Sequence, residues 1–122
     1  MTDRGMTAEQ VGQLEQIIKL FTPCMDDYLY LMDLKRDYYR ISKTAVNRFL
    51  LPDDHFYNAR EMHGTFVYPK DYVLLQEEFR KIQNKEISFH NLQYRWLDRK
   101  GEPVWINCRG QVLYDAMEIL LI

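Results

Sequence analysis

Extended segments stand in the first and last thirds of this chain with helical segments between them, and this order limits the folds that it can adopt. Residues 28–41 place aromatic and aliphatic residues on both sides of the polar stretch "DLKRD", which predicts a hairpin. Residues 87–98 and 103–115 flank "RKGE", where Gly101 suits a turn with positive φ, and "EILLI" adds a further strand. A lone hairpin is marginal in water, so both groups should join in one antiparallel sheet.

An amphipathic helix is expected before the first strands, in "TAEQVGQLEQIIKLF". Thr7 and Gln10 can form a capping box at its start, and Pro23 ends it. One stripe at helical spacing contains the apolar residues Val11, Leu14, Ile17, Ile18 and Phe21. This stripe either covers a core or binds a partner.

Further helical segments separate the two strand groups. Ser42 is placed to cap a short helix before Pro52, and a loop with a second short helix closes at Gly64. Pro69 and Asp71 suit the first turn of a longer helix, whose buried stripe consists of Tyr72, Leu75, Phe79 and Ile82. The prediction is therefore an α+β fold in which helices cover one face of the sheet.

Length and charge exclude several classes of protein. The 122 residues suit one compact domain, and a net charge of −2 with scattered basic residues does not favour nucleic-acid binding. Apolar runs are too short for membrane insertion. Cys24 and Cys108 have no CxxC companion, and free thiols suit a reducing cytoplasm.

The sequence offers no convincing catalytic or metal site. None of the three histidines has a second ligand at metal spacing, and His63 and His90 are expected on the surface, in a turn or at an edge. The adjacent carboxylates Asp53–Asp54 and Glu77–Glu78 should point apart on solvated faces. We therefore expect that the chain itself is not an enzyme and binds no metal.

Four stretches resemble a PAS domain of the type that precedes bacterial cyclic-di-GMP enzymes and sensor kinases. They are "DYLYLMDLKRDYYRIS", "FLLPDD", "YPKDYVLLQEEF" and "YRWLDRKGEPVWINCRG". Tyr68 replaces the family's usual His before Pro-x-Asp. The resemblance implies a five-stranded antiparallel sheet with a pocket between sheet and helices. It divides the chain into a flanking helix at residues 1–23 and a PAS-like sensor domain at 24–122, cut within or just after the last strand.

The run Asn107-Cys108-Arg109 is similar to the flavin-binding motif of LOV light sensors, where it lies on a helix. Here it falls on a strand whose alternation turns Cys108 inward among apolar residues, where a free cysteine packs as a hydrophobe. Flavin is therefore not expected. His63 lies in the region where haem-binding PAS sensors place an axial histidine, but its neighbours do not favour haem either.

The resemblance and the strand alternation together suggest two sets of functional residues. The core, or a pocket for an unidentified small molecule, should be lined by Leu29, Leu31, Leu92, Tyr94, Trp96, Ile106 and Cys108. An interface with the first helix or with a second copy should include Val11, Leu14, Ile18, Phe21, Trp105 and Arg109. Arg95 could share that face, or form only a surface ion pair.

The resemblance implies a cytoplasmic sensory module that acts as a homodimer. Its covalently linked output would be a GGDEF diguanylate cyclase, with a histidine kinase as the alternative. A ligand-free interaction or dimerisation module is the other reading of the same residues.

Overall fold

A computed structural model describes residues 8–21, 23, 27–113 and 117–121 of the chain. Its elements, in chain order, are α1 (Ala8–Phe21), β1 (Leu29–Asp33), β2 (Tyr38–Ile41), α2 (Lys43–Arg48), β3 (His55–Tyr57), α3 (Ala59–Met62), the 3-10 turn η2 (His63–Thr65), α4 (Pro69–Gln83), β4 (Phe89–Leu97), β5 (Pro103–Leu113) and β6 (Met117–Leu121). Thr7 and Cys24, which carried two of the sequence predictions, lie outside the described residues.

The two strand groups join in one sheet, as predicted. The strand order is β3-β2-β1-β6-β5-β4, and the groups meet where β1 pairs antiparallel with β6, with Leu31 opposite Ile119. The described sheet has six strands rather than five, because residues 55–57, expected as loop, pair with β2. Gly101 closes the β4–β5 hairpin with a φ of +81°, which confirms the predicted turn.

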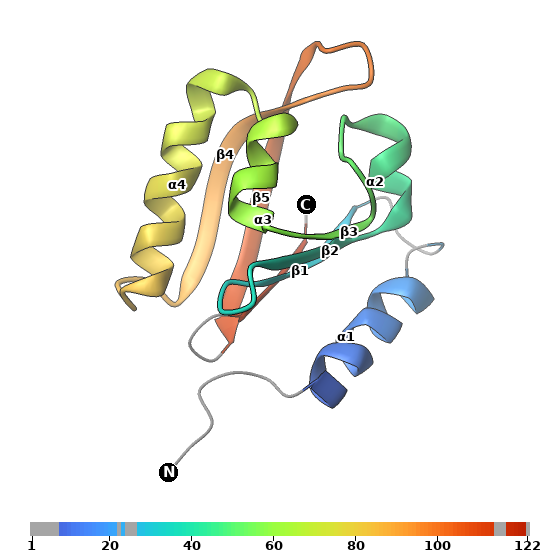
Figure 1. The fold of residues 1–122 in the computed structure, drawn as a ribbon, viewed down its shortest axis with the longest axis vertical. Helices are drawn as coiled ribbons and strands as arrows, with labels where there is room; N and C mark the ends of the chain where they lie inside the picture. Colours follow the sequence, from blue (N-terminus) through green and yellow to red (C-terminus); the bar gives the residue numbers. More distant parts are fainter. Residues whose placement is uncertain (1–7, 22, 24–26, 114–116, 122) are drawn as a thin grey trace.

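The sheet has helices on both sides (Figure 1). The main hydrophobic core lies between the sheet and α2, α3 and α4, and it includes Ala45, Ala59 and Leu75 from these helices. α1 lies alone on the opposite face, where Ile18, with Val11 and Leu14 beside it, packs on β1. We call this opposite side the outer face of the sheet. In the described part of the chain, no helix is both long and apolar enough to cross a membrane.

The position of α1 corrects one prediction about β1. Leu29 and Leu31 were expected in the main core, but they are buried on the outer face beneath α1. Tyr30 and Met32 take the core positions instead. Every residue of β1 is buried, so polarity does not alternate along this strand and its phase could not be read from the sequence.

The predicted starts of α2 and α4 are confirmed, but the Ser42 side chain does not have its predicted role. α4 begins at Pro69, and its buried residues include Leu75, Phe79 and Ile82, as predicted. α2 begins directly after Ser42, but the Ser42 hydroxyl makes no capping hydrogen bond. It accepts a hydrogen bond of 2.9 Å from the backbone N–H of Leu29 and so ties β2 to β1.

Candidate functional site

The inner face of the β4–β5 hairpin matches the predicted alternation. Tyr94, Trp96, Ile106 and Cys108 are buried in the main core, with Leu92 partly buried beside them. Tyr94 stands opposite Ile106 in the pairing of the two strands. The Cys108 sulfur lies 2.7 Å from the Tyr30 hydroxyl, with both side chains buried. Cys108 thus lies on strand β5 and packs against strand β1 of the core, whereas the LOV-type nucleophile lies on a helix.

Aromatic rings fill the space between the sheet and the helices. Trp96 meets Phe49 and Phe66 edge to face, with ring centroids 5.2 and 5.0 Å apart. All three side chains are fully buried. Within the described residues, the buried indole Nε1 of Trp96 has no hydrogen-bond partner. An unpaired N–H donor is costly to bury, and an acceptor atom of a bound molecule could supply the hydrogen bond that this one lacks.

His63 begins the turn η2, as one of its predicted positions allowed, but its ring is buried in this aromatic layer rather than on the surface. Its ring lies 4.7 Å from Tyr39, 4.8 Å from Phe66 and 5.8 Å from Phe79. Nδ1 donates a hydrogen bond of 2.6 Å to the carbonyl of Ala59, which fixes the neutral tautomer. Burial lowers the pKa of His63 to about 4. The ring is therefore uncharged at neutral pH and serves as a core aromatic.

His90 is also buried, although it stands on the edge strand β4 as expected. Its Nδ1 lies 2.8 Å from the carboxylate of Glu78 on α4. Burial lowers the pKa of His90, against the opposing effect of Glu78. The contact joins the C-terminal half of α4 to the edge of the sheet.

The exposed His55 belongs to a small polar cluster that the sequence did not predict. Asp53 and Asp54 were expected to point apart, but their carboxylates and His55 offer ligand atoms that all lie within 4.8 Å of one another. His55 Nδ1 contacts Asp54 at 2.6 Å. Exposed acidic groups of this kind are common without a bound ion, and hydrogen bonds among its own residues explain this cluster.

A second polar site joins the start of α4 to the edge of the sheet. The Asp71 carboxylate, which is buried, accepts two hydrogen bonds of 2.8 Å from the Arg95 guanidinium and one of 2.9 Å from its backbone N–H. These bonds lower the pKa of Asp71. The same guanidinium lies between the rings of Tyr68 and Trp105, at 4.3 and 4.6 Å from their centroids. Arg95 is therefore part of a fixed structure and more than a surface ion pair.

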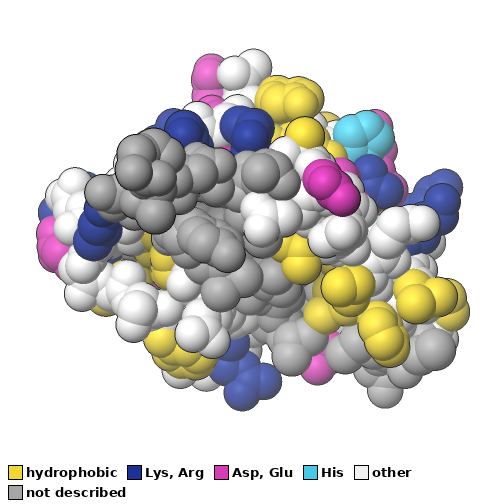
Figure 2. All heavy atoms as spheres, turned by 90° about the horizontal axis from the view of Figure 1, so that it is seen from below, with side chains coloured by type: hydrophobic (Ala, Val, Ile, Leu, Met, Phe, Trp, Pro, Cys, Tyr) yellow, Lys and Arg dark blue, Asp and Glu magenta, His cyan; other side chains and the backbone are white. Residues whose placement is uncertain are grey.

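The predicted interface residues divide into three groups in the structure. Val11, Leu14 and Ile18 of α1 pack on β1. Phe21, at the end of α1, is 47% exposed, and Ile17 and Leu20 of the same helix are exposed as well. Trp105 and Arg109 are exposed on β5. Figure 2 views the side of the molecule on which α1 lies and shows hydrophobic side chains gathered at its surface.

Polar contacts add to the packing of α1. Glu15 accepts a hydrogen bond of 2.6 Å from the Tyr38 hydroxyl and lies 3.5 Å from the guanidinium of Arg40. Burial and the neighbouring Glu15 raise the pKa of Tyr38. Three surface hollows of the described chain are all lined in part by α1, on both of its flanks. These hollows beside α1 offer room for another molecule.

Comparison with known proteins places this architecture in a family. A family profile described as PAS fold matches residues 41–119. Among solved structures, a sensory box histidine kinase/response regulator from Burkholderia thailandensis is 15% identical, with a TM-score of 0.61 over 84% of this chain and 79% of that chain. A domain of a sensory box sensor histidine kinase/response regulator from Geobacter sulfurreducens is 12% identical, with a TM-score of 0.57 over 92% of this chain and 91% of that chain. No curated protein sequence matches. The chain belongs to the PAS fold family.

Proposed function

We propose that this domain is a regulatory module of a signalling protein, and that it acts through the packing of α1 and a second copy of the domain on the outer face of the sheet. It performs no chemistry of its own. Membership of the PAS fold family and the filled aromatic core support this function. A PAS domain that binds nothing inside can still have two packings of its flanking helix, and a partner that favours one packing shifts the balance between them.

The exposed apolar flank of α1 is the observation that carries the proposal. Leu20 is 71% exposed and Phe21 47% exposed, at the end of a helix whose other side is already buried on β1. Exposed apolar side chains that lie together mark interaction surfaces. A two-fold symmetric dimer places the same patch of both copies in one contact, so these residues would bury each other.

Substitution of Leu20 tests the dimer. Leu20→Asp should raise the dissociation constant of the dimer at least about tenfold, because a carboxylate would replace one of the apolar contacts. Val73→Asp is the matched control, since Val73 is 69% exposed on α4, on the far side of the sheet from α1. Light scattering over a range of concentrations measures the effect. A monomeric wild type, or equal dimerisation of both variants, would overturn the proposal.

The output domain is the finer part of the proposal. The sequence resemblance favours a diguanylate cyclase, whereas the two similar structures are of sensory box histidine kinases, which makes a kinase the better-supported output. The whole protein that carries this domain separates the two. Autophosphorylation from ATP supports the kinase, and formation of cyclic di-GMP from GTP supports the cyclase. A reducing cytoplasm suits the free thiol of Cys108 and is part of the same proposal.

Ligand binding in the core is the second candidate function, and the unsatisfied Nε1 of Trp96 favours it. A small molecule with an acceptor atom would supply the missing hydrogen bond if the rings around it moved apart. Native mass spectrometry of the purified domain tests this function. A mass increment that disappears in Trp96→Phe supports a core ligand, and a clean apo mass in repeated preparations counts against it.

A further inference from the structure

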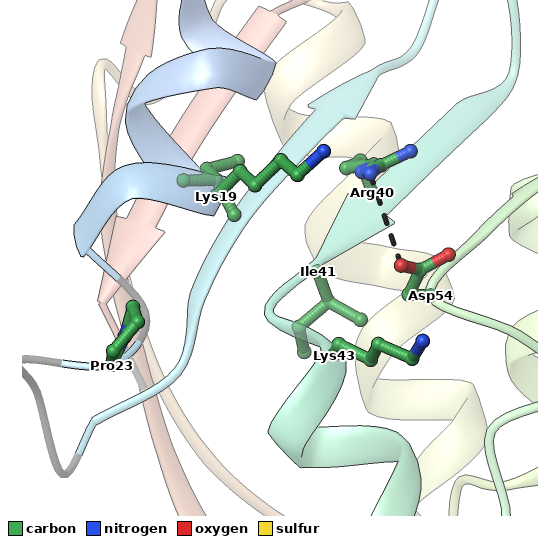
Figure 3. Close-up of a pocket in the computed structure, with 7 residues that line it drawn as sticks. Lys19, Pro23, Arg40, Ile41, Lys43 and Asp54 are labelled. Atoms are coloured by element: carbon green, nitrogen blue, oxygen red, sulfur yellow. Dashed lines mark ion pairs between the residues drawn. The ribbon is translucent and has the colours of Figure 1, made fainter.

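A groove lies between the C-terminal end of α1 and the point where β2 passes into α2. It encloses about 270 Å³ and is lined by Ile18, Lys19, Pro23, Arg40, Ile41, Lys43 and Asp54. Figure 3 shows these side chains arranged around the opening, with the cations contributed by three different elements. Ile18 and Ile41 are buried and form an apolar floor. The groove is thus a mixed site with charged walls.

Positive charge in this groove exceeds the negative charge available to balance it. Arg40 forms ion pairs with two carboxylates, Glu15 at 3.5 Å and Asp54 at 3.8 Å. Lys19 and Lys43 form no ion pair within the part of the chain that the structure describes. The lining of the groove therefore contains three cations and one carboxylate, that of Asp54.

The direction of the Lys19 side chain adds to this imbalance. Lys19 extends from α1 toward Arg40 of β2, so two like charges line the same opening (Figure 3). Like charges that approach in this way repel each other, and an anion placed between them would convert the repulsion into attraction. A guanidinium can bind a carboxylate or phosphate through two parallel hydrogen bonds.

We propose that this groove binds a small organic anion, a carboxylate or phosphate ester, with its charged group between Lys19 and Arg40 and its apolar part on Ile18 and Ile41. Lys43 supplies a further positive charge at the rim. This site is separate from the aromatic core and does not require that the domain be dimeric.

Such an anion would connect α1 to the body of the domain. Lys19 belongs to α1, whereas Arg40 and Lys43 belong to β2 and α2, so one bound anion bridges elements that meet over few apolar residues. An anion that binds only when α1 is docked must stabilise the docked state by the same coupling free energy. The groove would therefore let an anion control the position of α1.

Titration of the ¹⁵N-labelled domain tests the site with two probes, sodium succinate and inorganic phosphate, each against sodium chloride at equal ionic strength. Amide signals of residues 18–19 and 40–43 should shift with a dissociation constant on the order of a millimolar for at least one probe. Tighter binding of succinate identifies a carboxylate site, and tighter binding of phosphate a phosphate site. Amide exchange in α1 should become slower when the groove is saturated.

Charge-removing variants provide the controls. Lys19→Gln combined with Lys43→Gln should weaken binding at least about tenfold, because both ammonium groups at the opening are lost. Lys70→Gln, an exposed lysine at the start of α4, should bind as the wild type does. Equal melting temperatures will show that all variants are folded. Shifts no larger than those in sodium chloride, or equal affinities of the double variant and Lys70→Gln, would overturn the proposal.

Discussion

Asp71 and Arg95 form a bidentate ion pair that fastens the first turn of α4 to the edge strand β4. The carboxylate also accepts the backbone N–H of Arg95, so one side chain satisfies three donors. The two residues belong to separate sequence patterns, the Pro-x-Asp start of a helix and the Tyr-Arg pair of a strand. The structure gives a physical reason for both patterns to occur in one chain.

Asp71→Asn should lower the free energy of unfolding by about 2 kcal/mol, because a neutral amide cannot accept the guanidinium fork and the backbone N–H together. Glu77→Gln is the control, since Glu77 forms an exposed ion pair with Arg80 on the same helix and its loss should leave stability nearly unchanged. Urea denaturation at pH 7 measures both. Equal midpoints for the two variants would mean that the Asp71 contact adds no stability.

Ile106 and Asn107 test the phase of strand β5. Ile106→Asp should unfold the domain or cost several kcal/mol, because it places an unpaired carboxylate in the core. Asn107→Asp should change little, since Asn107 is exposed on the other face. Thermal melts followed by circular dichroism compare the two, and equal melting temperatures would show that the strand is placed one residue out of register.

His63 should make the domain sensitive to acid. Its pKa is about 4 in the folded state and about 6.5 when unfolded, so the unfolded chain binds more protons in the interval between these values. The contribution of His63 to stability is complete above pH 6.5 and is lost as the pH falls toward 4, by about 2 kcal/mol between pH 7 and pH 5.

His63→Phe keeps an aromatic ring in the layer but cannot titrate. Urea denaturation at pH 7 and pH 5 should therefore show a smaller acid loss for the variant than for the wild type, whatever its stability at pH 7. An equal loss in both proteins would show that His63 is already protonated in the fold or is not buried.

Ser42→Ala should cost about 1 kcal/mol through loss of a strand contact rather than of a helix cap. The backbone N–H of Leu29 would lose the hydroxyl that accepts its hydrogen bond in a buried position. Ser88→Ala, at an exposed position before β4, is the matched change. Thermal denaturation distinguishes the two variants, and similar melting temperatures would argue against the role assigned to Ser42.

The sequence was sufficient to predict which residues face the core where one face of an element is polar and the other apolar. The β4–β5 hairpin and the buried stripe of α4 have this property, and their inward residues were predicted correctly. It was insufficient for β1, which is buried on both faces because α1 covers the outer one. The three residues of β3 carry too short a pattern to be recognised as a strand.

The polar features of the site depend on tertiary contacts, which no local pattern contains. His63 sits between charged and small neighbours in the sequence, and its aromatic surroundings come from β2, β3 and α4. The groove likewise draws Lys19, Arg40 and Lys43 from three elements. The apolar stripe of α1 was the sequence pattern that pointed to this region. It predicted that the helix packs against another surface, but it did not identify that surface.

Release of α1 tests the central claim, that this helix carries the regulatory signal, most directly. Leu14→Asp should detach α1 from Leu29 and Leu31 while leaving the main core intact, because Leu14 belongs only to the smaller cluster on the outer face. The measurement is the output activity of the whole protein, with Val73→Asp as the control. We predict a severalfold change in activity for Leu14→Asp and none for the control. Amide exchange will show whether α1 is released in Leu14→Asp. If α1 is released and the output activity is unchanged, the account is contradicted.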